Sequence, residues 1–470
     1  MQLANILQII TAETKTKKLP DTDINWLLTD SRSLSFPAET LFFAIKSARN
    51  DGHLYIEELY RRQVRFFVVS ESLPVFDSMP EAVFLKVDDT RLALQRLAAA
   101  HRNMFNIPII GITGSNGKTV VKEWLYQLLH DDFRITRSPR SYNSQIGVPL
   151  SVWALNENSN LGIFEAGISQ PGEMERLRPV VRPTIGVFCN LGDAHQENFA
   201  SLKQKCEEKL KLFSESETLI YCADNKLVDI CVVQAKLKAR LLSWGKNENA
   251  TIQILSQAKN GTKTEVSLKL KDKVFNNIVI PFTDDASIEN ALQCVVTLIH
   301  FNYDEKVIRE RVLRLESVAM RLDVKDGIHN CLIINDSYNS DLNSLEIALN
   351  FLEQQSAAKK MPRTLILSDI LQSGQSPAEL YKTVADLVKV KNIQHIIGIG
   401  TEISAHAEEF DSLQKDFFPT TESFLKSSLS RSFQNEIVLL KGSRHFRFED
   451  ISEKLELINH ETVLEVNMNA

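Results

Sequence analysis

Short apolar runs alternate with segments of helical periodicity through the middle of the chain. The runs are almost continuously apolar, and the segments between them place apolar residues three and four positions apart. Continuous runs predict strands buried on both faces, and their alternation with helices predicts a parallel sheet covered on both sides. We therefore predict an α/β fold, with central strands at 107–113, 161–167, 184–192 and 218–224 and helices at 118–130, 172–178 and 201–213.

Similar patterns flank this central part. Before it, the chain is helix-like at 3–13 and 91–105 and strand-like at 40–45, 64–70 and 82–87. After it, strand-like runs occur at 331–337, 363–369, 393–400 and 435–442. Residues 250–282 alternate around Asn260-Gly261, which predicts an antiparallel insert, and helices are expected at 287–301 and 305–315.

These patterns predict three α/β domains in series, at 1–105, 106–316 and 317–459. Residues 460–470 look like a strand that is followed by neither a turn nor a cap, which indicates the start of a further domain.

The composition narrows the class of protein. The 470 residues are 43% hydrophobic and 24% charged, which excludes collagen-like and disordered chains. No apolar run is long enough to cross a membrane, and the N-terminus lacks the features of a secretory signal. The net charge of −6 comes from interspersed charges, so no basic surface for nucleic acid is indicated. Six scattered cysteines predict reduced thiols. Together, these features predict a cytoplasmic protein that is not embedded in a membrane.

Glycine is unevenly distributed. The chain has only 17 glycines, and nine of them fall between Gly111 and Gly192. Glycine is required where the backbone takes a positive φ or another group approaches closely, so this stretch is a candidate binding region. A stretch that merely contains more turns is the alternative.

The strongest motif in this stretch is Gly111-Ile112-Thr113-Gly114-Ser115-Asn116-Gly117-Lys118-Thr119, which follows a predicted strand and opens a predicted helix. In that context, backbone N–H groups surround phosphate oxygens. Lys118 is expected to reach the β- and γ-phosphates, and Thr119 to bind Mg²⁺. Ile112 occupies the position of the usual first glycine, and the alternative is a tight turn with a chance Lys-Thr pair.

Acidic groups end two neighbouring predicted strands. Glu165 ends one of them, and Asp193 and His195 end the next. Ligands of open α/β sheets bind at the carboxyl ends of the strands, so these side chains are candidates for holding Mg²⁺ near the phosphates. Taken alone, His195 is also compatible with an ordinary loop histidine.

With these residues in place, a series of blocks in order along nearly the whole chain resembles the Mur ligase family. The blocks are 30–32, 49–53, 113–119, 142–150, 165–167, 190–195, 290–291, 320–322, 336–339 and 441–443. The resemblance implies three domains: an N-terminal UDP-sugar-binding domain, a central ATPase domain with a mononucleotide-binding parallel sheet, and a C-terminal Rossmann-like domain.

The resemblance also implies an activity. It indicates an ATP-dependent amide ligase that joins D-alanyl-D-alanine to UDP-MurNAc-tripeptide through an acyl phosphate. Another ligase of the family, or a folylpolyglutamate synthase with a different amine acceptor, is the nearest alternative. A non-catalytic nucleotide-binding regulator would be expected to have lost the metal ligands. A transport or motor ATPase would usually place an aspartate where Glu165 stands.

Roles for individual residues follow from the same resemblance. It implies catalytic roles for Lys118, Lys209 and His195, and Mg²⁺ ligands at Thr119, Glu165, His195 and Lys209, with Lys209 carbamylated. From its neighbours alone, Lys209 could equally lie on a solvated helix face. ATP contacts are implied for Gly114, Ser115, Asn116, Gly117, Lys118, Thr119, Asn290, Arg321 and Asp336. The plainer alternatives are a helix-capping or core-edge amide for Asn290 and an exposed ion pair for Arg321 and Asp336.

Substrate contacts are implied for Ser31, Arg32, Asp51, His53, Asn143, Tyr338, Asn339 and Lys441. The chain departs from the family pattern at Ser47, at 340–344 and at 368–370, which affects the expected sugar and D-alanyl-D-alanine contacts. The last residues, 460–470, resemble the first strand of alanine racemases, so a fused racemase domain is a further expectation.

Overall fold

The computed structural model describes residues 1–470 except 48–49, 73, 193–195, 372, 374 and 458–470. Asp193, His195 and the segment 460–470, for which the sequence predicts a metal site and a further domain, lie outside the described residues. The described residues form three β-sheets, each flanked by helices, as the α/β pattern predicted.

The N-terminal sheet is parallel and has four strands. They run in the order β1 (Trp26–Leu28), β2 (Thr40–Phe43), β3 (Phe66–Val69) and β4 (Val83–Lys86). The helices of this region are α1 (Leu3–Ile9), α2 (Ile56–Arg61) and α3 (Thr90–Arg102). The first helix is shorter than the predicted 3–13, because Thr11 has a φ of +54°, which a right-handed helix cannot accommodate.

The central sheet has nine strands in the order β13-β12-β11-β10-β9-β8-β5-β7-β6. Its parallel part contains β5 (Ile109–Thr113), β6 (Ile135–Arg137), β7 (Leu161–Glu165), β8 (Ile185–Phe188), β9 (Thr218–Cys222) and β10 (Arg240–Gly245). Strand β5 lies between β7 and β8, so the carboxyl ends of these three strands are neighbours.

Both faces of the central sheet are buried. On one face, Ile110 and Ile112 of β5 pack with α4 (Lys118–Leu129), α9 (Asp285–His300) and α10 (Glu305–Val312). On the other face, Ile109 of the same strand packs with apolar residues of α5 (Gly147–Trp153), α6 (Glu173–Val181), α7 (Leu202–Leu210) and α8 (Lys226–Gln234). This is the two-sided burial that the continuous apolar runs predicted.

An antiparallel insert extends the central sheet. It consists of β11 (Ile252–Asn260), β12 (Lys263–Leu270) and β13 (Lys273–Ile280), and β11 pairs in parallel with β10. Asn260 pairs with Lys263, so the two turn residues are Gly261 and Thr262, one position later than an Asn-Gly turn. Gly261 has a φ of +59°, which suits the glycine-first type II′ turn of a two-residue hairpin.

The C-terminal sheet has six strands in the order β14-β15-β19-β16-β17-β18. They are β14 (Asp323–Asp326), β15 (Leu332–Asp336), β16 (Arg363–Ser368), β17 (His395–Ile399), β18 (Gln414–Phe418) and β19 (Ile437–Lys441), with only the edge strand β14 antiparallel. Helices α11 (Leu342–Lys359) and α12 (Pro377–Val390) pack on one face, and α14 (Thr421–Lys426) and α15 (Glu449–Leu455) on the other, with α13 (Thr401–Ala405) following β17.

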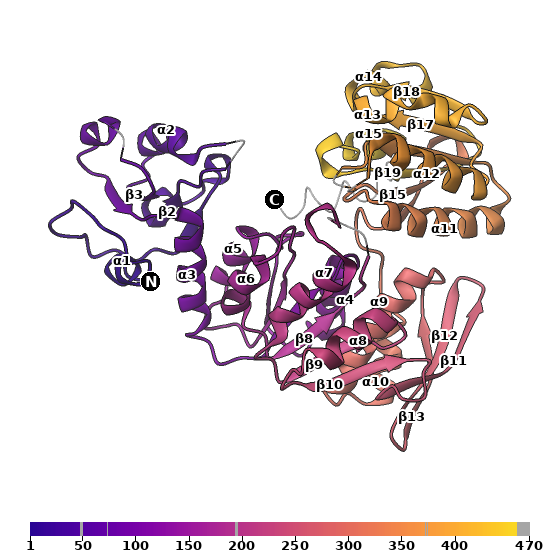
Figure 1. Ribbon diagram of the computed structural model, residues 1–470, viewed down its shortest axis with the longest axis horizontal. Coiled ribbons are helices and arrows are strands. Elements are labelled where there is room, and N and C mark those ends of the chain that lie inside the picture. Colours follow the sequence, from indigo (N-terminus) through magenta and orange to yellow (C-terminus); the bar gives the residue numbers. More distant parts are fainter. Residues whose placement is uncertain (48–49, 73, 193–195, 372, 374, 458–470) are drawn as a thin grey trace.

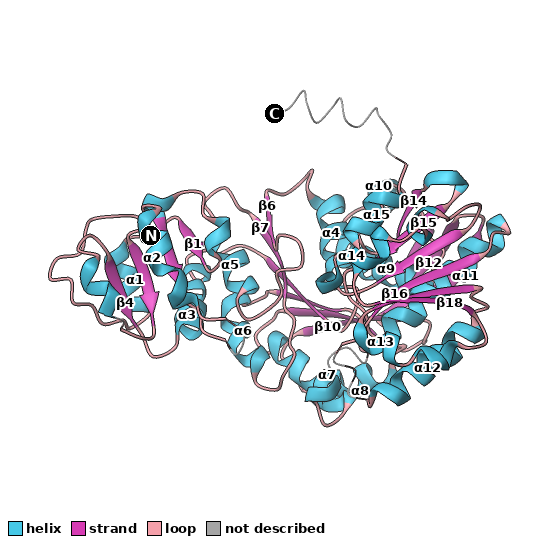
Figure 2. Cartoon of the chain, turned by 90° about the horizontal axis from the view of Figure 1, so that it is seen from above, coloured by secondary structure: helices cyan, strands magenta, loops and turns pink. Residues whose placement is uncertain are grey.

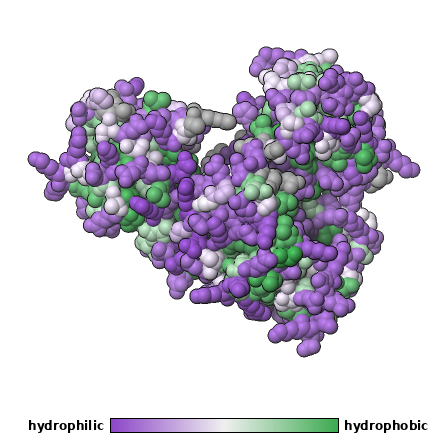
Figure 3. Space-filling view, in the orientation of Figure 1, coloured by the Kyte–Doolittle hydropathy of each residue, from purple (hydrophilic) through white to green (hydrophobic). Residues whose placement is uncertain are grey.

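The three sheets form separate bodies. In Figure 1 the N-terminal body, in indigo, and the C-terminal body, in orange and yellow, adjoin the central body on different sides. Seen from above, the N-terminal sheet lies at one end of the molecule and α11 and α12 near the other (Figure 2). Hydrophilic side chains cover most of the face seen in Figure 3. Among the described residues, no helix is long and apolar enough to cross a membrane.

Candidate functional site

The loop after β5 has the backbone geometry that phosphate binding requires. Gly114 has a φ of +147° and Gly117 a φ of +85°, both in the region that favours glycine. A Cβ on Gly114 would lie 2.9 Å from the carbonyl oxygen of Asn190, so a side chain would not fit at that position. Helix α4 begins at Lys118, directly after this loop, so its free N–H groups face the loop.

Two lysines converge on one carbonyl group of this loop. The Nζ atom of Lys118 lies 2.8 Å from the Gly114 oxygen and 2.8 Å from that of Ser115. The Nζ atom of Lys209, from α7, lies 3.0 Å from the same Gly114 oxygen. Burial lowers the pKa of both lysines, that of Lys209 well below its ordinary value, and the charge of Lys118 lowers it further.

Helix α7 and the chain after β8 hold the loop in place. The Ser115 amide donates to the Asn190 oxygen at 2.6 Å, and the Ser115 hydroxyl donates to Gly192 at 2.9 Å. The Nζ atom of Lys205 lies 2.5 Å from the same Gly192 oxygen. Lys205 and Lys209 are both buried, so the alternative of a solvated helix face does not hold for these two residues.

A fully buried carboxylate lies beside the first turn of α4. Glu165, the last residue of β7, accepts a hydrogen bond from the Thr119 hydroxyl at 3.1 Å and one from the Asn143 amide at 3.3 Å. Its other oxygen lies 3.2 Å from the Nζ atom of Lys122, which donates to the Ser138 carbonyl at 2.8 Å. Carboxylate, hydroxyl and amide oxygens are the donors that Mg²⁺ prefers, so the residue types here fit that ion. Within the described part of the chain, no three acidic, histidine or cysteine side chains cluster as a metal site.

A cavity of about 540 Å³ adjoins the loop and reaches all three bodies. Its walls include these predicted site residues: Gly114, Ser115, Asn116, Gly117, Lys118, Thr119, Asn143, Lys209, Asn290, Arg321, Asp336, Tyr338, Asn339 and Lys441. Glu165 does not line it, although its partners Thr119 and Asn143 do. The tertiary structure therefore assembles most of the predicted nucleotide contacts around one cavity.

One side of the cavity is aromatic. The indole of Trp124 stacks on Phe282, with ring centroids 4.9 Å apart, and both residues line the cavity. Asp284 caps α9 by accepting from the Ser287 amide at 2.8 Å. Asn290 lies on the same helix and packs against Gly117. The capping role in α9 therefore belongs to Asp284, and the Asn290 amide faces the phosphate loop.

The C-terminal body contributes a buried ion pair. Asp336 and Lys441 are register partners at the ends of β15 and β19, and their charged atoms are 2.7 Å apart. Arg321 lies over the ring of Tyr338, with its guanidinium carbon 4.1 Å from the ring centroid, and its Nη2 atom is 3.4 Å from the Ser141 hydroxyl. Arg321 and Asp336 therefore do not form the exposed ion pair that was the alternative interpretation.

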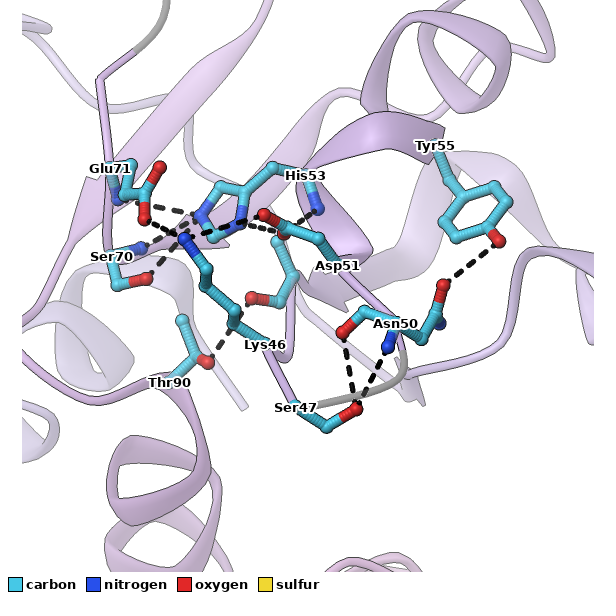
Figure 4. Close-up of polar contacts among 10 residues, drawn as sticks. Lys46, Ser47, Asn50, Asp51, His53, Tyr55, Ser70, Glu71 and Thr90 are labelled. Carbon is cyan, nitrogen blue, oxygen red and sulfur yellow. Dashed lines mark hydrogen bonds and ion pairs between the residues drawn. The ribbon is translucent and has the colours of Figure 1, made fainter.

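The N-terminal candidates lie away from this cavity. His53 is buried, and its Nδ1 atom is 2.6 Å from the Asp51 carboxylate (Figure 4). Its Nε2 atom accepts from the Ser70 amide at 3.1 Å, so both ring nitrogens are used within the protein. Arg32 is exposed and paired with Asp30 at 2.6 Å, and the buried Ser31 accepts from Arg62 through its carbonyl group.

Several residues of the site were not singled out from the sequence. Among them are Arg91, Lys122, Ser141 and Asp284. Lys122 lies one helical turn after Lys118, so a search for polar residues four positions beyond the motif would have found it. Arg91 and Ser141 come near the site only through tertiary contacts, and neither has a local signal.

Comparison with known proteins assigns the family. Residues 112–298 match the model of the Mur ligase middle domain. The chain therefore contains a Mur ligase middle domain. A relative from Bacillus subtilis (strain 168), named UDP-N-acetylmuramoyl-tripeptide–D-alanyl-D-alanine ligase, is 27% identical over 96% of this chain and 97% of its own length.

Solved structures of Mur ligases share the fold of this chain. The UDP-N-acetylmuramoylalanyl-D-glutamyl-2,6-diaminopimelate–D-alanyl-D-alanyl ligase from Acinetobacter baumannii has a TM-score of 0.79 and 23% identity, over 96% of this chain and 97% of the other. The MurF ligase from Thermotoga maritima, solved in complex with ADP, has a TM-score of 0.72 and 20% identity, over 93% and 98% of the two chains. The three-sheet architecture is thus the Mur ligase fold, as the motifs implied.

Proposed function

We propose that this Mur ligase joins D-alanyl-D-alanine to UDP-MurNAc-tripeptide at the expense of ATP. The observation that carries the proposal is the cavity shared by the phosphate loop of the central body and the Asp336–Lys441 pair of the C-terminal body. A ligase of this kind must bring a nucleotide, a carboxylate and an amine together, and this cavity has walls from every part of the chain. The full-length relative from Bacillus subtilis carries the name of this activity.

The chemistry begins with activation of a carboxylate. A carboxylate is a poor electrophile, so its oxygen attacks the γ-phosphate of ATP and forms an acyl phosphate with release of ADP. The amine of D-alanyl-D-alanine then attacks the acyl carbon, and the tetrahedral intermediate collapses to the amide and phosphate. Lys118, at the start of α4, is positioned to offset the negative charge of the γ-phosphate during the first step.

Lys209 is proposed to act as a carbamate. The buried amine has a lowered pKa, and a neutral amine is the form that adds CO₂, giving a carbamate anion and one proton. Together with Thr119, Glu165 and the predicted ligand His195, the carbamate would hold Mg²⁺, which would supply positive charge next to the phosphates. Asn116 and Asn290 are proposed to contact the nucleotide, with Arg321 and Asp336 joining from the C-terminal body.

The remaining predicted contacts belong to the UDP-linked tripeptide and D-alanyl-D-alanine. Ser31, Arg32 and the loop of Asp51 and His53 are proposed to bind the UDP-sugar, with His53 positioning the loop from beneath. Asn143, Tyr338, Asn339 and Lys441 are proposed to contact the peptide or D-alanyl-D-alanine. We propose domain limits at 1–105, 106–316 and 317–459, and a cytoplasmic location, since ATP and nucleotide-linked precursors are found there.

A coupled assay tests the proposal. The full chain is incubated with ATP, Mg²⁺, UDP-MurNAc-tripeptide and D-alanyl-D-alanine, and phosphate release and the pentapeptide product are measured. Turnover is expected only when UDP-MurNAc-tripeptide and D-alanyl-D-alanine are both present. Lys118→Ala should lower it by roughly 10³-fold. Phosphate release that does not depend on D-alanyl-D-alanine would refute the proposal.

A further inference from the structure

Arg91 occupies a fixed position at the junction of the N-terminal and central bodies. It lies in the first turn of α3, where its amide donates to the Asp89 cap at 2.8 Å. The neighbouring Thr90 hydroxyl donates to the Ala44 carbonyl, just after β2, at 3.2 Å. The backbone from which the Arg91 side chain extends is therefore anchored to the N-terminal sheet.

The guanidinium group of Arg91 has no partner among the described residues. Its Nε atom is buried without a hydrogen bond, and no carboxylate of the described chain forms an ion pair with it. The side chain nevertheless lines the cavity that contains the phosphate loop. Arg91 is half-buried, and a buried guanidinium nitrogen without an acceptor is unfavourable, a cost that a ligand carboxylate would remove.

Contacts of Gln95, one helical turn after Arg91, show which way this side of α3 faces. The Gln95 side chain donates to the Gln145 side chain at 2.9 Å and to its carbonyl at 3.1 Å. Gln145 follows Asn143 and Ser144, and all three line the cavity. Residues four apart share a helix face, so Arg91 lies on the side of α3 that meets the central body.

The acidic residues in the cavity wall are engaged elsewhere. Glu173 accepts from the Ser169 amide at 2.6 Å, Asp336 pairs with Lys441, and Asp284 caps α9. Among the described residues, none of these three carboxylates pairs with Arg91. Arginine is suited to such a role because its two parallel N–H groups bind a carboxylate in a bidentate manner.

The location of Arg91 indicates which part of the substrate this residue contacts, and this assignment rests on the proposed function. The candidate UDP-sugar loop with Asp51 follows β2, and Ala44, to which Thr90 is bound, lies at the same end of that strand. The reacting carboxylate must reach Lys118 in the phosphate loop, which lines the same cavity as Arg91. The peptide that connects the sugar to that carboxylate therefore has to pass α3.

We propose that Arg91 binds a carboxylate of the substrate peptide that does not take part in the reaction. The peptide named for the Acinetobacter baumannii ligase contains a glutamyl and a 2,6-diaminopimelate residue. Each of these residues keeps one free carboxylate when it is linked through the other. Arg91 thus recognises the peptide part of the substrate and contributes to substrate affinity rather than to the chemical step.

Steady-state kinetics with altered enzyme and altered substrate test this proposal. Arg91→Met keeps the apolar stem and should raise the KM for UDP-MurNAc-tripeptide by roughly 10–100-fold, with the KM values of ATP and D-alanyl-D-alanine unchanged. Arg96→Met, an exposed position on the same helix, is the matched control and should change nothing. Two altered substrates are also tested, one with glutamine in place of the glutamyl residue and one with lysine in place of diaminopimelate. The KM of wild type should rise by a similar factor for one of them.

The combination of the two changes is decisive. The altered substrate for which wild type has the raised KM lacks the carboxylate that Arg91 contacts. Arg91→Met should have the same KM for that substrate as for the unmodified one. Wild type that tolerates both replacements would overturn the proposal, and this result does not depend on how well the variant folds. Absence of turnover with every tripeptide would instead count against the proposed function.

Discussion

The Nζ atom of Lys209 donates a hydrogen bond of 3.0 Å to the carbonyl oxygen of Gly114. A helix that follows β8 is thereby tied to the loop that follows β5, and Lys118 approaches the same oxygen. Two cationic side chains around one carbonyl group are costly in a buried site unless one of them is neutral or modified.

Lys209→Ala is expected to lower turnover by roughly 10²-fold, because the carbamate would be lost from the phosphate-binding region. Short carboxylates such as acetate should restore part of the activity by occupying the vacated space. Lys203→Ala is the control, since Lys203 is exposed on the same helix and pairs with Glu207. Turnover is measured by phosphate release, and no rescue by any short carboxylate would argue against a carbamate.

His53→Ala should raise the KM for the UDP-linked substrate and destabilise the N-terminal body. The substitution leaves the partly buried Ser70 amide without its acceptor, a loss of about 1 kcal/mol. Thermal unfolding and KM measurements on the full chain check both effects. His130→Ala, at an exposed position, should behave like wild type; equal KM values for all three proteins would contradict the positioning role.

Lys441→Met should lower the free energy of unfolding by about 3–5 kcal/mol, because it leaves the charge of Asp336 buried without its partner. The double variant Asp336→Asn/Lys441→Met should recover much of that loss, since neither charge remains. Urea titration of the full chain, followed by a probe of the C-terminal body, measures the difference. Additive effects of the two substitutions would show that the pair is not coupled.

The stability of the junction between α3 and α5 should depend on pH through His101. Burial lowers the pKa of His101, whose ring lies 4.5 Å from that of Trp153. The unfolded chain then binds more protons than the folded chain near pH 6, so stability is complete above about pH 6.5 and falls as the pH decreases. His101→Gln should flatten this dependence in thermal unfolding between pH 5 and 8, relative to wild type, and parallel pH profiles for the two proteins would exclude this role.

Met320 precedes Arg321 in a tight turn and has a φ of +59°. The Arg321 amide donates to the Val318 carbonyl at 3.0 Å across this turn. A β-branched residue is strained in this conformation and glycine is not, so Met320→Val should be less stable than Met320→Gly by about 1–2 kcal/mol. Thermal unfolding of both variants measures this, and Ala319→Val serves as the control for the added bulk.

Much of the fold could be predicted from local pattern. Continuous apolar runs marked β5, β7, β8 and β9 because a strand covered on both faces has no polar positions. Element ends were less predictable: α1 ends at Ile9, earlier than its pattern, and the hairpin turn uses Gly261 and Thr262. Both differences arise from backbone angles at single residues, which hydrophobic periodicity does not report.

The candidate site was partly visible in the sequence and partly not. The loop from Gly114 to Thr119 is a contiguous motif whose glycines and lysine act together, so it could be found directly. Lys209 was named from family resemblance, whereas its burial beside Gly114 depends on the packing of α7. Arg91 gave no signal at all, because a basic residue in the first turn of a helix is ordinary until its neighbours are known.

By itself, the sequence determined that this protein has an α/β fold with a phosphate-binding loop and the ordered motifs of the Mur ligases. Those features depend on short-range chemistry: backbone freedom at glycine, periodic burial and contiguous polar groups. Only the tertiary structure decided that Lys209 joins Lys118 at Gly114 and that Asp336 pairs with Lys441. It also decided that Arg91 faces the cavity without a partner among the described residues. Side chains far apart in the chain meet only when separate sheets pack, and the free energy of a buried charge is set by those neighbours.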